Sequence, residues 1–65
     1  MFEIGMSFKV YDNNKFNGIT GKIVDSNETM SLVAFHENGY LFGMYSVFNT
    51  TIENNLKYGS YKINK

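Results

Sequence analysis

The dipeptide Asn38-Gly39 constrains the fold most, because it separates two apolar runs in the segment SLVAFHENGYLFGMYSVF, residues 31–48. A two-residue type I′ turn needs positive φ at both central positions, and Asn-Gly is a strongly preferred pair there. The dipeptide therefore predicts an antiparallel hairpin and its register. The pairs expected on one face are Glu37 with Tyr40, Phe35 with Phe42 and Val33 with Met44, and those on the other are His36 with Leu41, Ala34 with Gly43 and Leu32 with Tyr45.

Both faces of this predicted hairpin are apolar. We assign Val33, Phe35, Phe42 and Met44 to the core. The opposite face, formed by Leu32, Ala34, Leu41 and Tyr45, then has two explanations. A strongly bent strand can bury part of both faces, or the second face is an exposed apolar patch of the kind that marks an interface.

The rest of the chain also alternates between apolar segments and Asn/Gly/Asp punctuation, which is typical of an all-β domain. MSFKVY, Met6–Tyr11, places Met6, Phe8 and Val10 on one face of a first strand. A second strand is expected over Ile19–Asp25, between the polar loop DNNKFNG and the turn SNET. We expect Gly18 to supply a positive φ, and Gly21 to allow a close backbone approach or a bulge.

One short helical or 3-10 turn is predicted after the hairpin, because Thr50 and Glu53 have capping-box spacing and Ile52 and Leu56 lie one helical turn apart. YGSYKI, Tyr58–Ile63, alternates as a last strand. Five strands with a helical turn before the fifth predict an all-β fold. We expect a single five-stranded SH3-like barrel spanning residues 1–65.

Composition restricts how this chain of 65 residues is stabilised and what it binds. It has no Cys and one His, so neither a disulfide nor a typical metal site is expected to support the small core. Six Lys balance six acidic residues and Arg is absent, whereas nucleic-acid-binding domains usually carry a basic excess. No signal peptide and no membrane-spanning apolar run are apparent, so we expect a cytoplasmic protein with no membrane partner.

No constellation of catalytic residues can be assembled from the sequence. A serine triad would have to use His36, whose neighbour Glu37 points to the opposite face of the same strand. Gly18 and Gly21 are not followed by the Lys-Ser/Thr ending of a phosphate-binding loop. We therefore expect no enzymatic activity, no cofactor and no bound metal.

The first 26 residues resemble a KOW-type segment, the short motif of several ribosomal proteins and transcription elongation factors. The matching features are Gly5 before an alternating strand, a polar loop, Gly18, Gly21 and the pair Ile23-Val24. VAFHENGYLFGMYSVF is similar to the middle hairpin of many small bacterial SH3-like proteins. The resemblance implies an SH3-like barrel that contacts RNA, DNA or protein.

Two binding functions follow. The leading hypothesis is a module that docks on another protein, alone or as a homodimer, because interface centres favour Tyr, Phe and Met over Lys and Glu. Its expected contact residues are Leu32, Tyr40, Leu41, Tyr45, Tyr11 and Phe16. The alternative is a KOW-like nucleic-acid-binding barrel, in which Lys9, Lys15 and Lys22 contact phosphates while Tyr11 or Phe16 stacks on bases.

The composition also bears on the origin of the chain. Small single-domain chains that are rich in Asn, Lys and Ile and lack catalytic residues are typical of AT-rich genomes, including those of phages and mobile elements. The docking hypothesis therefore extends to an inhibitor or modulator of a host protein.

Overall fold

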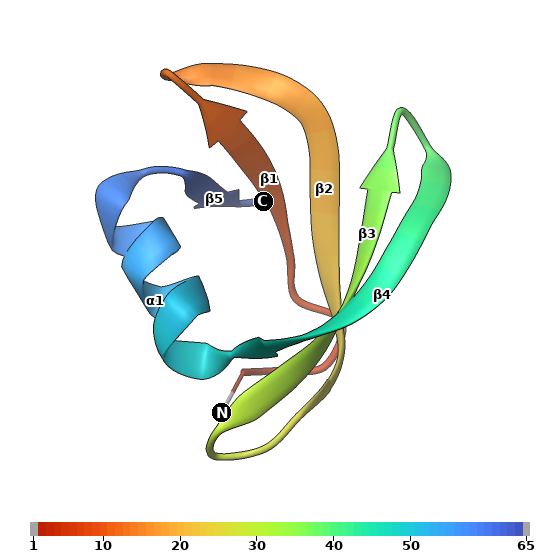
Figure 1. Ribbon diagram of the computed structural model, residues 1–65, viewed down its shortest axis with the longest axis vertical. Helices are drawn as coiled ribbons and strands as arrows, with labels where there is room; N and C mark the ends of the chain where they lie inside the picture. Colours follow the sequence, from red (N-terminus) through yellow and green to blue (C-terminus); the bar gives the residue numbers. More distant parts are fainter. Residues whose placement is uncertain (1, 65) are drawn as a thin grey trace.

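The computed structural model describes residues 2–64, which form one antiparallel sheet and one helix (Figure 1). The sheet has the strand order β4-β3-β2-β1-β5. The predicted all-β fold with five antiparallel strands is confirmed in this form. The elements in chain order are β1 Ser7–Asp12, β2 Lys15–Ser26, β3 Met30–Glu37, β4 Tyr40–Phe48, α1 Asn49–Tyr58 and β5 Tyr61–Ile63.

The sheet of residues 2–64 is open, so the expected closed barrel is wrong for this chain. Strands β4 and β5 are its two edges. The fifth strand has only three residues, Tyr61–Ile63, and these pair with β1. The helix α1 lies between the end of β4 and the start of β5 and contacts both strands, on the side where a barrel would close (Figure 1).

The helix is longer than the single turn expected from the sequence. It runs over Asn49–Tyr58 and ends at Gly59, which adopts the left-handed conformation common at helix C-termini. The predicted capping box is wrong, because the N-cap residue is Phe48 and Thr50 lies inside the helix. The helix start is held instead by the buried Asn49, whose Oδ1 accepts a hydrogen bond from Ser31 Oγ at 2.6 Å.

The core lies between the helix and the inner face of the sheet. Four side chains are fully buried there, namely Phe8, Ile23, Val33 and Ile52. Met6 and Val10 pack against this cluster, which confirms the predicted apolar face of the first strand. The Phe8 ring stacks on Tyr61 with 4.4 Å between ring centroids, and so ties the last strand to the core.

The two glycines of the first hairpin have the structural roles expected of them. Gly18 has φ of +87°, in the left-handed region that other residues resist. A Cβ at Gly21 would lie 2.5 Å from the tip of the Phe8 ring, so glycine lets the ring pack against the β2 backbone. β2 begins earlier than predicted, because Asn13 and Asn14 both take positive φ and turn the chain in two residues.

Candidate interaction surfaces

A β-bulge in β4 changes the predicted register of the second hairpin. Glu37 pairs with Tyr40 and His36 with Leu41, as expected from the Asn38-Gly39 turn. The register then shifts by one residue, so that Phe35 lies opposite Gly43 and not opposite Phe42. The remaining pairs shift with it, to Ala34 with Met44, Val33 with Tyr45 and Leu32 with Ser46.

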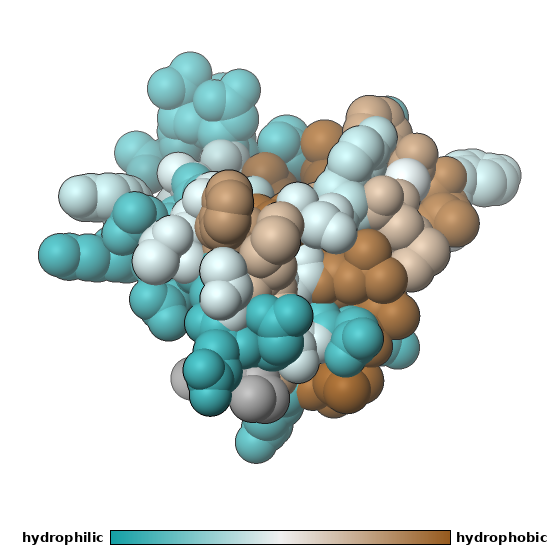
Figure 2. Space-filling model, turned by 60° about the horizontal axis from the view of Figure 1, so that its bottom comes forward, coloured by the Kyte–Doolittle hydropathy of each residue, from teal (hydrophilic) through white to brown (hydrophobic). Residues whose placement is uncertain are grey.

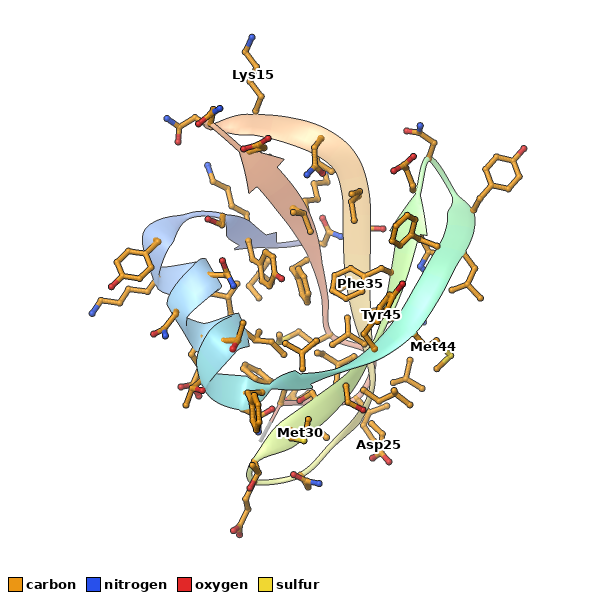
Figure 3. The ribbon with its side chains drawn as sticks, in the orientation of Figure 1. Lys15, Asp25, Met30, Phe35, Met44 and Tyr45 are labelled. Atoms are coloured by element: carbon orange, nitrogen blue, oxygen red, sulfur yellow. The ribbon has the colours of Figure 1, made fainter. Side chains whose placement is uncertain are left out.

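This shift exchanges the faces of the residues that follow it. Met44 was assigned to the core and Tyr45 to the docking face, and both assignments are wrong, since Tyr45 pairs with Val33. Tyr45 lies beside Phe35 on the inner face (Figure 3). The Tyr45 ring lies over Gly43, and its centroid is 6.0 Å from that of Phe35. Phe42 is not a core residue either, because it lies at the bulge and is 60% exposed. Val33 and Phe35 do belong to the core and its border.

An apolar surface, which we call the outer patch, covers the opposite face of the sheet. It consists of Val24, Leu32, Leu41 and Met44, from strands β2, β3 and β4. Leu41 is 61% and Met44 48% exposed, while Ala34 between them is buried. Figure 2 shows hydrophobic residues gathered on the side of the molecule on which β4 lies. The exposed patch is therefore the better of the two explanations for the doubly apolar hairpin.

A shallow hollow adjoins the outer patch at its lower end in Figure 3, where Asp25 and Met30 are labelled. Its volume is about 330 Å³, and its lining combines Leu32 and Met30 with polar groups of the β2–β3 turn and Ser46. The turn is held by Asn27, whose side-chain Oδ1 accepts hydrogen bonds from the N–H groups of Thr29 and Met30. The apolar surface is thus continuous with a polar-rimmed depression.

A second cluster lies at the other end of the same face, and we call it the lysine–aromatic cluster. Tyr11 and Phe16 are cross-strand partners with 5.9 Å between their ring centroids. The Lys9 ammonium lies over the Phe16 ring at 5.3 Å, and the Lys62 ammonium over the Tyr11 ring at 4.6 Å. Lys9 and Lys62 are themselves cross-strand partners on β1 and β5.

The predicted contact residues therefore divide into separate groups. Leu32 and Leu41 belong to the outer patch, with Tyr40 beside them at the hairpin tip and 81% exposed. Tyr11 and Phe16 belong to the lysine–aromatic cluster. Lys9 also lies in that cluster, whereas Lys22 is central on the outer face, opposite Ala34, and Lys15 is at the β1–β2 tip, opposite Asp12.

Sequence reasoning missed Met44 and Lys62. Met44 was missed because the bulge is not encoded in the alternation of residue types. The signal for Lys62 was the alternation of YKI in β5, which places the lysine on the face opposite the buried ring of Tyr61. Only the pairing of β5 with β1 brings it beside Lys9.

No family model matches the chain, and searches of curated proteins and of solved structures also give no match. The KOW resemblance therefore stays a prediction. Within residues 2–64, no helix is long and apolar enough to cross a membrane, and no three or more His, Asp or Glu side chains gather as a metal site would require.

Proposed function

We propose that this chain is a non-catalytic interaction module that docks on another protein through the outer patch. The observation that carries the proposal is an exposed apolar surface on the side of the sheet that faces away from the core. Leu41 and Met44 form its centre on β4, and Leu32 and Val24 extend it over two further strands. Their exposure to water is unfavourable, and a partner surface that excludes the water recovers this free energy.

The chemistry of the patch defines the partner surface. The four patch residues carry no charge, so the matching surface is apolar and uncharged at its centre, with a polar rim. Ser46 beside the hollow supplies a hydroxyl group at the border of the patch. For a chain from a phage or mobile element, that partner is a host protein whose activity the module inhibits or redirects.

The docking proposal is tested by capture of protein partners from lysate, after nuclease treatment, with single substitutions in the patch. Leu41→Asp and Met44→Asp are expected to abolish capture of a stoichiometric partner while circular dichroism and the unfolding midpoint stay close to those of the wild type. Tyr58→Asp is the matched control, since Tyr58 is 77% exposed but lies at the end of α1. Capture that survives both patch substitutions would refute this surface as the docking site.

Binding of single-stranded nucleic acid is a second candidate function, favoured by the lysine–aromatic cluster. Aromatic rings on a sheet face stack with bases, and lysines beside them neutralise phosphates. Tyr11 and Phe16 supply two rings, and Lys9 and Lys62 lie within 6 Å of them. Lys22 extends the positive charge along the same face.

This second function predicts affinity that falls with salt. For three phosphates neutralised, the logarithm of the association constant should fall with the logarithm of salt concentration with a slope of about −2 on a single strand. Fluorescence anisotropy with a labelled mixed-sequence oligonucleotide measures the slope. Lys62→Gln and Phe16→Ala should weaken binding, whereas Lys57→Gln should not, although Lys57 also lies over a ring, that of Tyr58 at 6.0 Å. Equal effects of Lys57→Gln and Lys62→Gln would remove the cluster as the site.

A further inference from the structure

The edge strand β4 lacks most of the features that keep sheet edges from pairing with other chains. Such edges are usually short, charged, interrupted by proline or covered. Strand β4 has nine residues, YLFGMYSVF, without a single charge or proline. The opposite edge strand, β5, is protected, because it has three residues and carries Lys62. The one protective feature of β4 is its bulge, which lies near the hairpin tip and leaves residues 44–48 in regular register.

The backbone of β4 has hydrogen-bonding groups directed away from the sheet. Asn49 N–H donates to Thr29 O at 2.9 Å, immediately beyond the pair of Phe48 with Met30. Since hydrogen-bonded pairs alternate along an antiparallel ladder, Val47 and Tyr45 face β3, while Ser46 and Met44 face outward. Among residues 2–64, backbone hydrogen bonds outside the helix and the ladders involve none of residues 40–48. The outward groups of Met44 and Ser46 are therefore available to another strand.

We propose that β4 pairs with β4 of a second copy of this chain, antiparallel about a two-fold axis near Met44, so that the two five-stranded sheets become one. A register centred on Met44 places the outward N–H and C=O groups of the two Met44 residues opposite each other, at the midpoint of Tyr40–Phe48. In a two-fold arrangement the same patch serves both subunits, so it must be complementary to itself. An uncharged strand in a chain of net charge zero meets that condition, because its copies do not repel each other.

The side chains of β4 supply the apolar area that such a dimer needs. Six of the eleven exposed large hydrophobic residues in the described chain lie on this strand: Tyr40, Leu41, Phe42, Met44, Tyr45 and Phe48. At roughly 100 Å² of exposed area each, about half of what a large aromatic side chain can bury, two copies expose on the order of 1,200 Å², and pairing covers the part of this area that faces the copy. Pairing also brings the two outer patches side by side. The inference does not depend on the proposed docking function, because it concerns the strand edge and not the face.

The first test compares molar mass in solution for the full chain and for edge variants. Light scattering after size exclusion should give twice the chain mass of 7.5 kDa for the wild type. Ser46→Pro removes an outward N–H that the fold does not use, and it should give a folded monomer. Ser46→Ala is the matched control and should stay dimeric. A monomeric wild type would overturn the proposal, even if the monomer captured a different protein through this edge. A dimer that survives Ser46→Pro would also overturn it.

A second test, with charged substitutions at Met44, does not depend on whether Ser46→Pro folds. Met44→Lys and Met44→Glu should each be monomeric, because like charges meet at the two-fold axis, and an equimolar mixture should form a heterodimer. In the wild type, the amides of Met44 and Ser46 should exchange hydrogen as slowly as those of Tyr45 and Val47. Fast exchange at Met44 and Ser46 in a dimer would place the interface elsewhere and contradict the pairing. Loss of the dimer with unchanged Leu41-dependent capture would leave the docking function standing.

Discussion

The two ends of the outer sheet face differ in how their apolar side chains are covered. At the β1–β5 end, the rings of Tyr11 and Phe16 lie beneath the ammonium groups of Lys62 and Lys9. At the β3–β4 end, Leu41 and Met44 are 61% and 48% exposed. Lysine stems cover apolar surface while keeping the charge in water. This contrast motivates the proposal that the β3–β4 end, which we call the bare end, docks on a protein partner.

The inner face shows the same asymmetry. On the inner face of β1 and β2, Phe8 and Ile23 are fully buried in one cluster with Ile52 of the helix. Under the hairpin tip, the Tyr45 ring is half exposed although it packs on Phe35. The helix contacts β5 and β4 close to its own ends and leaves the tip of the hairpin uncovered (Figure 1). The molecule therefore has a covered end at β1 and β2, where the buried core lies, and a bare end at the β3–β4 hairpin, where apolar side chains stay exposed.

The largest expected effect is on the free energy of unfolding, and it distinguishes the covered end from the bare end. Phe8→Ala should lower the free energy of unfolding by about 3–5 kcal/mol, since it empties a fully buried site. That loss is comparable with the whole stability of about 3–10 kcal/mol expected for a domain of this size. Met44→Ala should change it by less than about 1 kcal/mol in the monomer. Urea denaturation of a monomeric background such as Ser46→Pro measures both, and equal losses would contradict the division into two ends.

A smaller effect should distinguish the two faces of β4. Tyr45→Ala is expected to cost about 1 kcal/mol, because its ring covers Gly43 and contacts Phe35. Leu41→Ala should be within about 0.5 kcal/mol of the parent, because Leu41 points to solvent on the outer face. The same denaturation series measures the pair. A greater cost for Leu41→Ala would mean that the bulge does not exchange the faces as described.

The smallest effect is a dependence of stability on alkaline pH at the covered end. Burial raises the pKa of Tyr61 above its ordinary value of about 10. The unfolded chain then loses this proton at lower pH than the folded chain does. Stability from this group is fully present below pH 10 and is lost as the pH rises through the raised pKa.

Absorbance titration of phenolate formation measures this difference. Tyr61→Phe should remove the component that titrates last and should reduce the alkaline loss of stability. Tyr40→Phe is the control, because Tyr40 is exposed at the bare end. If Tyr40→Phe removed the last component instead, Tyr61 would not be the buried phenol.

The sequence by itself determined the local geometry. Asn38-Gly39 predicted a hairpin and the first two pairs of its register, because few dipeptides accept two positive φ angles. The alternation of Met6, Phe8 and Val10 predicted the buried face of β1. Gly18 and Gly21 were correctly interpreted as backbone requirements. These features depend on a few neighbouring residues, so they can be inferred without knowledge of the fold.

The tertiary structure alone decided which apolar residues are covered. The bulge at Phe42 and Gly43 reversed the faces of Met44 and Tyr45, and nothing in the alternation of YLFGMYSVF marks that position. The three turns of α1 form because Ile52 and Leu56 find a core to pack on, not because of a capping box. The open edge at β4 and the meeting of Lys62 with Lys9 depend on which strands become neighbours. Whether a residue is buried depends on contacts between segments that are distant in the chain. Which strands become neighbours depends on the free energy of packing them together, and this cannot be inferred from one segment alone.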